Sequence, residues 1–333
     1  MDGIDLEILR RMTQHSDVGG AGLDPRISAR QISAKVKVSP ATVKARWRRW
    51  TQEGFVQSWV CEPNLRLFGV EALVQRVVLP GPQGVPQLLN ELDDVDGLIA
   101  VRTGFHEGFD GVYIHGISLQ TVRDHPSAVA RRQRLLRRLV PEGHFEAPIP
   151  MEYRPCNLDH PSGLDWRIIQ ALLEQPHLSP RALGIRLKVS WKTAVRHYNR
   201  LFDSGALLFG PVLDRSRFPG ITLAIVYQDP QSRDEIFHHL ETRFRYYAPW
   251  DRWTLFPDLL IGDPNVLRVT VPVRTPAEAD IITGEIRSWN GVVRALRVQL
   301  TGGREYLQWM RQRIDEKVAE AAARPSPKRR RPA

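Results

Sequence analysis

The sequence contains an internal repeat with a constant offset of 151 residues, and this repeat limits the possible folds more than any other feature. Identical residues recur at this offset, among them Lys37 and Lys188, Val38 and Val189, Ser39 and Ser190, Thr42 and Thr193, and Gly54 and Gly205. Upstream of Ser28 the first repeat carries about nine additional residues, rich in glycine, which are typical of a loop. We therefore predict a tandem duplication of one unit of about 150 residues.

Each repeat begins with a pattern typical of three helices. In the first repeat, Ser28 is predicted to cap the second helix, and Ser39 followed by Pro40 predicts the start of the third. The third helix has apolar residues at i, i+4 and i+7, namely Val43, Trp47 and Trp50. After Gly54 we expect a wing-like pair of short strands over residues 55–60, so the pattern predicts a winged helix-turn-helix.

After each of these units the pattern changes to strand, helix, strand, strand, helix, strand. In the first repeat we predict strands over 72–78, 98–103, 111–116 and 145–153, and helices over 85–92 and 119–139. In the second we predict strands over 222–227, 253–261, 267–272 and 292–300, and helices over 234–243 and 276–288. This order is that of the ferredoxin-like sandwich.

The predicted fold class is therefore α+β, with two winged helix-turn-helix domains alternating with two ferredoxin-like (βαββαβ) sandwich domains. The expected domains are winged helix-turn-helix units over 1–62 and 156–213, ferredoxin-like units over 63–155 and 214–302, and a C-terminal helix with a disordered basic tail over 303–333.

Cysteine content and hydropathy exclude several classes of protein. The two cysteines, Cys61 and Cys156, have no metal-ligand spacing, so we expect no metal site and no cofactor. The N-terminus is acidic and the apolar runs are short, so we expect neither a signal peptide nor a membrane span. These features predict a cytoplasmic protein.

The net charge of +10 is concentrated in three segments. Residues 28–52 carry seven cations and no acid, residues 179–201 carry six cations and no acid, and residues 324–333 carry five cations. The rest of the chain is therefore net acidic. Because two of the basic segments coincide with the predicted helix-turn-helix units, this distribution favours a nucleic-acid partner.

Both repeats, and thus nearly the whole chain, resemble the Lrp/AsnC (feast/famine) family of transcription regulators, most specifically in the first helix-turn-helix. The resemblance is carried by IDLEIL at 4–9, SARQIS at 28–33, VSPATV at 38–43, the segment 46–56 and PNLRLFG at 63–69. It implies DNA binding through the third helix and a ferredoxin-like domain that dimerises and, in many members, senses amino acids. Because this chain fuses two units, we expect the two-fold pairing to form within one chain.

The predicted DNA-binding residues lie on the third helix of each repeat. In the first they are Ser39, Ala41, Thr42, Lys44, Ala45, Arg46, Arg48 and Arg49. In the second they are Lys192, Thr193, Val195, Arg196, Asn199 and Arg200. We expect Arg46 and Arg49 to contact phosphates. Because Val195 takes the place of Lys44, the second copy is either a DNA binder of different or weaker preference or a degenerate structural copy.

The resemblance also implies an effector site at Gly104 and Asp110, in the predicted loop between the second and third strands. The expected effector is a small molecule such as an amino acid. A plain hairpin turn explains the same glycine and aspartate. We further expect that the chain forms a homo-oligomer.

An enzyme is the main alternative, because sirohaem decarboxylases also resemble paired Lrp/AsnC units. Its candidate residues are His106, His115, His238, His239 and Arg245. No His and Arg constellation is shared by the two halves, so we expect no enzymatic activity. An architectural DNA-binding protein of low specificity is a third class. The sequence favours a nucleoid-associated, sequence-specific transcription regulator that binds double-stranded DNA.

Overall fold

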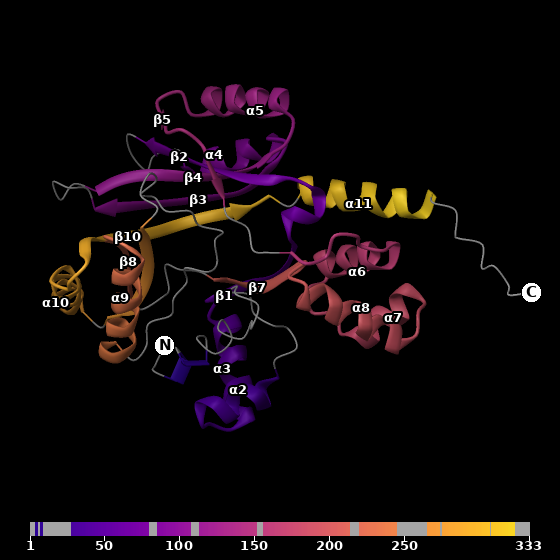
Figure 1. Cartoon of the computed structure of the whole chain (residues 1–333), viewed down its shortest axis with the longest axis horizontal. Helices are drawn as coiled ribbons and strands as arrows, with labels where there is room; N and C mark the ends of the chain where they lie inside the picture. The colour runs from indigo at the N-terminus through magenta and orange to yellow at the C-terminus, as the bar shows by residue number, and fades with distance from the viewer. Residues whose placement is uncertain are drawn as a thin grey trace, which may run out of the picture.

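The structure is a computed structural model of the chain, with helices and strands mixed along it as in an α+β protein (Figure 1). It describes residues 4–5, 7–8, 28–79, 85–107, 113–151, 156–213, 220–244, 265–273, 275–306 and 308–323. Within these ranges, no helix combines the length and the apolar character that crossing a bilayer needs.

The first helix-turn-helix consists of α2 (Ala29–Val36) and α3 (Pro40–Gln52). Ser28 and Gln31 form a capping box at the start of α2, and the Ser39 hydroxyl accepts a hydrogen bond from the Thr42 amide at the start of α3. Lys37, with φ of 58°, makes the left-handed turn between the two helices. The predicted starts of both helices are confirmed.

The second helix group repeats this local geometry. It consists of α6 (Gly163–Glu174), α7 (Pro180–Leu187) and α8 (Trp191–Asp203). Lys188 has φ of 56° between α7 and α8, and the Ser190 hydroxyl accepts from the Thr193 amide. The turn residues and caps of the two groups thus coincide at the offset found in the sequence.

The predicted wing is wrong. Residues 55–60 do not form a pair of short strands; instead β1 (Val56–Pro63) is one strand, and it pairs antiparallel with β7 (Leu207–Leu213) of the other half. Trp59 stacks on Phe209 across this pair, with ring centroids 5.1 Å apart. The edge of each strand is therefore covered by its counterpart rather than by a local hairpin.

One hydrophobic core joins both helix groups. It contains Val43 and Trp50 of α3, Ala194 and Leu201 of α8, and Ile314 of α11 (Gln308–Ala323). α11 packs against α6, where Gln170 donates a 2.7 Å hydrogen bond to Asp315. The two helix groups and the C-terminal helix α11 therefore bury apolar side chains in one common core. The domain boundaries expected from the sequence stay a prediction.

The second layer of the molecule is a large sheet with the strand order β5-β2-β4-β3-β10-β8-β9, in which β6 also pairs with β2. Its strands are β2 (Glu71–Leu79), β3 (Leu98–Glu107), β4 (Tyr113–Arg123), β5 (His144–Phe145), β6 (Ile149–Met151), β8 (Gly220–Tyr227), β9 (Val266–Pro272) and β10 (Val292–Glu305). The order of β5, β2, β4 and β3 is consistent with a ferredoxin-like unit.

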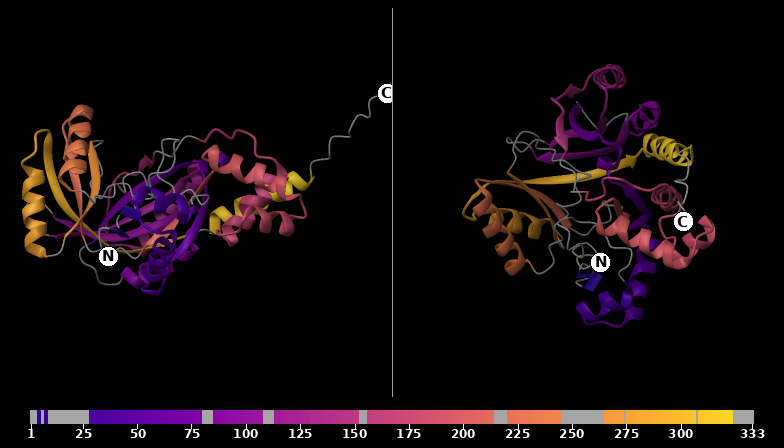
Figure 2. Two further views of the ribbon diagram at one scale, coloured as in Figure 1. Left: turned by 90° about the horizontal axis from the view of Figure 1, so that it is seen from below. Right: turned by 45° about the vertical axis from the view of Figure 1, so that its right-hand side comes forward.

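The remaining helices accompany the sheet. They are α4 (Val85–Glu91) and α5 (Pro126–Leu139) in the first half, α9 (Pro230–Arg243) and α10 (Pro276–Arg287) in the second, and the short 3-10 turns η1 (Leu65–Phe68) and η2 (Leu92–Asp94). α4 and α5 lie on the side of the sheet away from α3, whereas β1 and β7 lie on the near side, between the two helix groups (Figures 1 and 2).

Several predicted boundaries are wrong because of tertiary pairing. The helix expected over 119–139 begins only at Pro126, since β4 continues to Arg123 alongside β2. The strand expected over 292–300 continues to Glu305, because β10 pairs first with β8 and then with β3. α9 begins at Pro230, where Asp229 caps the helix. The strand expected over 253–261 lies outside the described residues.

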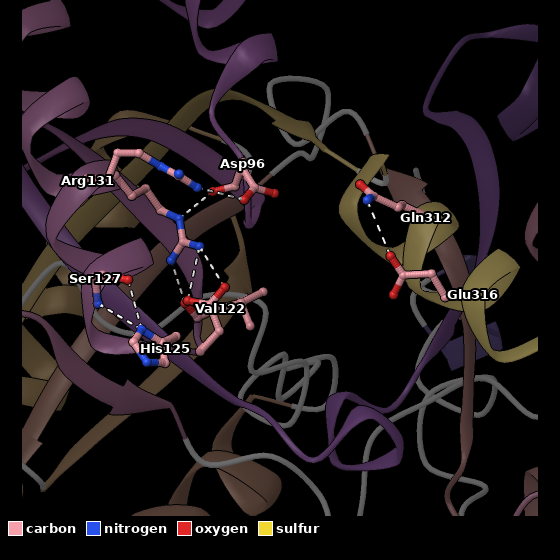
Figure 3. Close-up of polar contacts among 9 residues, drawn as sticks. Asp96, Val122, His125, Ser127, Arg131, Gln312 and Glu316 are labelled. Carbon is pink, nitrogen blue, oxygen red and sulfur yellow. Dashed lines mark hydrogen bonds and ion pairs between the residues drawn. The ribbon is translucent and has the colours of Figure 1, made fainter. Parts of the chain in front are cut away.

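Two arginines of α5 attach this helix to the sheet (Figure 3). Arg132 is buried and donates to the carbonyl oxygens of Asp96 and Val122, while Arg131 lies 3.6 Å from the Asp96 carboxylate. Gly97 has φ of 72°, and a Cβ there would lie 2.0 Å from Arg132 Nη2. The glycine therefore makes room for the Arg132 guanidinium, which serves packing, whereas the Arg131 side chain is 71% exposed.

Candidate nucleic-acid interface

The outward face of α3 is formed by four exposed residues, Ala41, Lys44, Ala45 and Arg48. Their spacing of i, i+3, i+4 and i+7 places them on one face of the helix. On the opposite face Val43 is 0% and Trp50 is 1% exposed, so this side anchors the helix in the core. α3 thus presents two small methyl groups and two cations to solvent.

Two predicted contact residues, Ser39 and Thr42, form the N-terminal cap of α3. The Thr42 amide donates to Ser39 Oγ at 3.0 Å, and the two hydroxyl oxygens lie 2.9 Å apart in a hydrogen bond. Their hydroxyls therefore stabilise the start of the helix. The positive end of the helix dipole at this cap favours an anion such as a phosphate. Direct DNA contact by these residues stays a prediction.

Arg46 and Arg49, expected to contact phosphates, hold a buried carboxylate. Asp5 has 0% exposure, and its oxygens bind Arg46 Nη1 at 3.0 Å, the Arg49 guanidinium, and Trp50 Nε1 at 3.2 Å. A buried carboxylate requires such partners. These arginines therefore fasten α3 to the first helical segment of the chain, and their phosphate contacts stay a prediction.

The second unit has the corresponding network around Asp165, which is also 0% exposed. Its carboxylate binds His197 Nδ1 at 2.7 Å and the Arg200 guanidinium, and it accepts from the amide and hydroxyl of Ser162. His197 and Arg200 stand at the offset of 151 from Arg46 and Arg49. Arg200, a predicted DNA contact, therefore has a structural partner of its own.

Burial by itself would raise the pKa of Asp165. Hydrogen bonds from Ser162 and His197, together with the charge of Arg200, outweigh that effect and hold the pKa of this carboxyl below its usual value. Asp165 is therefore ionised at neutral pH. Neither carboxylate was predicted from the sequence, although Asp5 and Asp165 each stand three positions before a fully buried isoleucine, Ile8 and Ile168.

The outward face of α8 has a different composition. Lys192 and Arg196 are exposed, whereas Val195 and Asn199 are half-buried. Trp191, the first residue of α8, is 59% exposed. Thr193 takes part in the cap together with Ser190, as Thr42 does in the first unit. The four outward residues correspond in position, but not in chemistry, to those of α3.

The predicted effector residues are not in one loop of the described structure. Gly104 is buried within β3, where it pairs with Gly116 of β4 on one side and Leu300 of β10 on the other. Its placement in a loop is therefore wrong, because pairing with β10 extends β3. Asp110 lies outside the described residues. The effector site itself stays a prediction.

The four histidines considered for an enzyme are distributed over three elements, β3, β4 and α9. His115 is half-buried on β4, and His106 is on β3. His238 and His239 are exposed on α9, with ring centroids 6.4 Å apart, and Arg245 lies outside the described residues. Among the residues that the structure describes, no group of three or more His, Cys, Asp or Glu side chains is arranged to hold a metal ion.

Comparison with known proteins identifies the type of helix-turn-helix domain at the start of the chain. Residues 1–49 match the model of the AsnC-type helix-turn-helix domain, so the chain carries a domain of this type at its N-terminus. No curated protein sequence matches the chain. The match includes α2 and most of α3, and it therefore covers all four outward residues of α3.

The chain is also similar to several solved structures. Siroheme decarboxylase NirDL is 10% identical, with a TM-score of 0.47, and covers 97% of this chain and 100% of its own. The leucine response regulatory protein LrpA of Mycobacterium tuberculosis is 16% identical, with a TM-score of 0.30, over 45% of this chain and 92% of its own. AsnC of E. coli is 15% identical, with a TM-score of 0.32, over 46% and 94%. Sequence identities and TM-scores this low assign no function to the chain.

Proposed function

We propose that this protein is a sequence-specific DNA-binding transcription regulator without enzymatic activity. The observation that carries the proposal is the AsnC-type helix-turn-helix in residues 1–49, whose third helix presents Ala41, Lys44, Ala45 and Arg48 to solvent on one face. In helix-turn-helix proteins the second helix of the motif lies in the major groove, and its outward residues contact base edges. The double-stranded DNA partner follows from that geometry.

Cations near α3 supply the phosphate contacts in this proposal. Arg30 on α2 and Lys37 in the turn are exposed, and Lys37 lies two residues before Ser39, the cap of α3. Phosphate contacts fix the orientation of a protein on the duplex, whereas contacts to the base edges select the sequence. Lys44 and Arg48 are therefore assigned to base edges, and the cations of α2 and the turn to the backbone.

The proposal includes a tandem duplication, in which the two helix-turn-helix units face DNA as a two-fold pair. β1 and β7 pair antiparallel, with Trp59 opposite Pro211 and Val60 opposite Gly210. At the offset of 151, Trp59 corresponds to Gly210 and Val60 to Pro211. Replacing each residue by its counterpart in the other repeat therefore turns the pair Trp59–Pro211 into the pair Gly210–Val60. This is the register of an isologous, two-fold interface. Such a pair fits two inverted half-sites on one duplex.

The test is a titration of the full chain against fluorescent duplexes at several salt concentrations. We expect the affinity for a random-sequence duplex to fall steeply with salt, because binding releases counterions from phosphates. We also expect genomic fragments selected by the protein to bind at least about 10³-fold more tightly than the random duplex. Absence of duplex binding contradicts the proposal. Equal affinities for the selected fragments and the random duplex would indicate an architectural protein rather than a sequence-specific regulator.

A further inference from the structure

Cationic and uncharged residues alternate along the outward faces of α3 and α8, but in opposite order. On α3 they are Ala41, Lys44, Ala45 and Arg48, and on α8 they are Lys192, Val195, Arg196 and Asn199. The cations therefore occupy the second and fourth positions on α3, but the first and third positions on α8. Because the two helices begin at equivalent caps, each position on one helix has a direct counterpart on the other.

These side chains prefer different bases. Lysine and arginine donate to the N7 and O6 acceptors of guanine, and asparagine pairs with adenine. The methyl groups of alanine and valine make apolar contacts with the C5-methyl group of thymine. Where α3 carries a cation and favours guanine, α8 carries valine or asparagine and favours thymine or adenine. Where α8 carries a cation and favours guanine, α3 carries alanine and favours thymine.

Apolar surface continues beside Val195. Trp191 lies four residues earlier on α8, and it stands where the first unit has Pro40. α7 approaches α8 closely at Gly184, where a Cβ would lie 3.4 Å from Trp191 Cα, and the next residue, Ile185, is 76% exposed. Residues 179–201 contain six cations and no acid. An apolar strip surrounded by positive charge fits thymine methyl groups within a polyanion.

We propose that the two helices read non-identical half-sites, so that the preferred operator is an inverted pair in which guanine positions in one half-site correspond to thymine or adenine positions in the other. This inference rests on the proposed function, because it specifies the DNA that the same two helices recognise. It assigns a reading role to Lys192, Val195, Arg196 and Asn199, rather than a degenerate structural one.

The test exchanges the outward residues of one helix for those of the other in the full chain. The α8 variant is Lys192→Ala, Val195→Lys, Arg196→Ala and Asn199→Arg. It removes two cations and adds two, so the net charge and the electrostatic affinity are preserved. Wild type and variant each select duplexes from a randomised library. We expect an asymmetric motif for the wild type and an inverted repeat of identical half-sites for the variant.

The reciprocal α3 variant is a matched control for folding and for direction. It carries Ala41→Lys, Lys44→Val, Ala45→Arg and Arg48→Asn, and it is also neutral in charge. We expect it to select an inverted repeat as well, built from the other half-site. If one variant fails to fold by circular dichroism, the other still tests the inference. As a second measurement, uracil in place of thymine in the α8 half-site should weaken wild-type binding several-fold.

The outcomes separate this inference from the proposed function. A wild-type protein that selects no motif contradicts the proposed function itself. A wild-type motif with identical half-sites, or with a single half-site, overturns the inference and leaves the function intact. An asymmetric wild-type motif that neither exchange alters also overturns it. An unchanged motif together with a changed oligomeric state of the α8 variant on gel filtration overturns the inference and assigns the outward residues of α8 to protein docking instead.

Discussion

The double variant Lys44→Glu and Arg48→Glu is expected to bind the selected operator at least about 100-fold more weakly than the wild type. Each good contact between a side chain and a base is worth about 1–3 kcal/mol, and about 1.4 kcal/mol corresponds to a factor of ten. The two carboxylates would also face the phosphate backbone, which adds repulsion. A gel-shift titration of the full chain measures the effect.

The control reverses two cations of the same spacing elsewhere on the molecule. Arg134 and Arg138 are exposed on α5, four residues apart as Lys44 and Arg48 are, and α5 lies on the far side of the sheet from α3 (Figure 1). The variant Arg134→Glu and Arg138→Glu has the same net charge and is expected to lose less than about tenfold in affinity. Equal losses in the two variants would show that only net charge matters.

The second large effect concerns the stability of the second unit. Asp165→Ala is expected to lower the free energy of unfolding by about 3 kcal/mol. The charged carboxylate accepts hydrogen bonds from His197 and Arg200 of α8, and hydrogen bonds to a charged group are each worth about 1.5–3 kcal/mol. It also completes the capping box of α6 with Ser162. Partial exposure of Arg200 limits the loss, because this guanidinium regains water when its partner is removed.

Urea unfolding measures this difference, with Asp315→Ala as the matched control. Asp315 is exposed on α11 and accepts one hydrogen bond from Gln170, so its removal should cost less than about 0.5 kcal/mol. Asp165→Asn keeps the shape but loses the charge, and it should fall between the two. A loss below about 1 kcal/mol for Asp165→Ala would show that the buried network adds little.

The cost of Asp165→Ala should also depend on pH. Because the pKa of Asp165 is lowered in the folded protein, its contribution to stability is fully present above the usual carboxyl pKa of about 4. That contribution disappears as the pH falls through the lower pKa of the folded state. The stability difference between wild type and Asp165→Ala is therefore expected to shrink in acid.

Local features of the fold were predictable from the sequence because local residues determine them. Ser28 was predicted as the N-cap of α2, and Ser39 followed by Pro40 as the start of α3, and both helices begin there. The outward positions of α3 followed from the apolar spacing of Val43, Trp47 and Trp50. The strand patterns of β2 and β8 were read correctly for the same reason.

Features that depend on distant partners were not predictable in this way. Residues 55–60 have the composition of a strand, but nothing in them specifies β7 as the partner. The last part of β10 contains Gly302 and Gly303, and it is a strand only because β3 lies beside it. The ion pairs of Arg46 and Arg49 with Asp5 join residues more than 40 positions apart, so the charges of residues 28–52 alone did not predict them.

Hydroxyl-radical footprinting of the full chain on a selected operator tests most directly whether both helix-turn-helix units contact one DNA duplex. The account predicts two protected segments on the same face of the duplex, with centres separated by a whole number of helical turns of about 10 base pairs. Charge reversal at Lys44 and Arg48 should then remove protection from one segment first. A single protected segment in the wild type, or uniform protection along the duplex, would contradict the account.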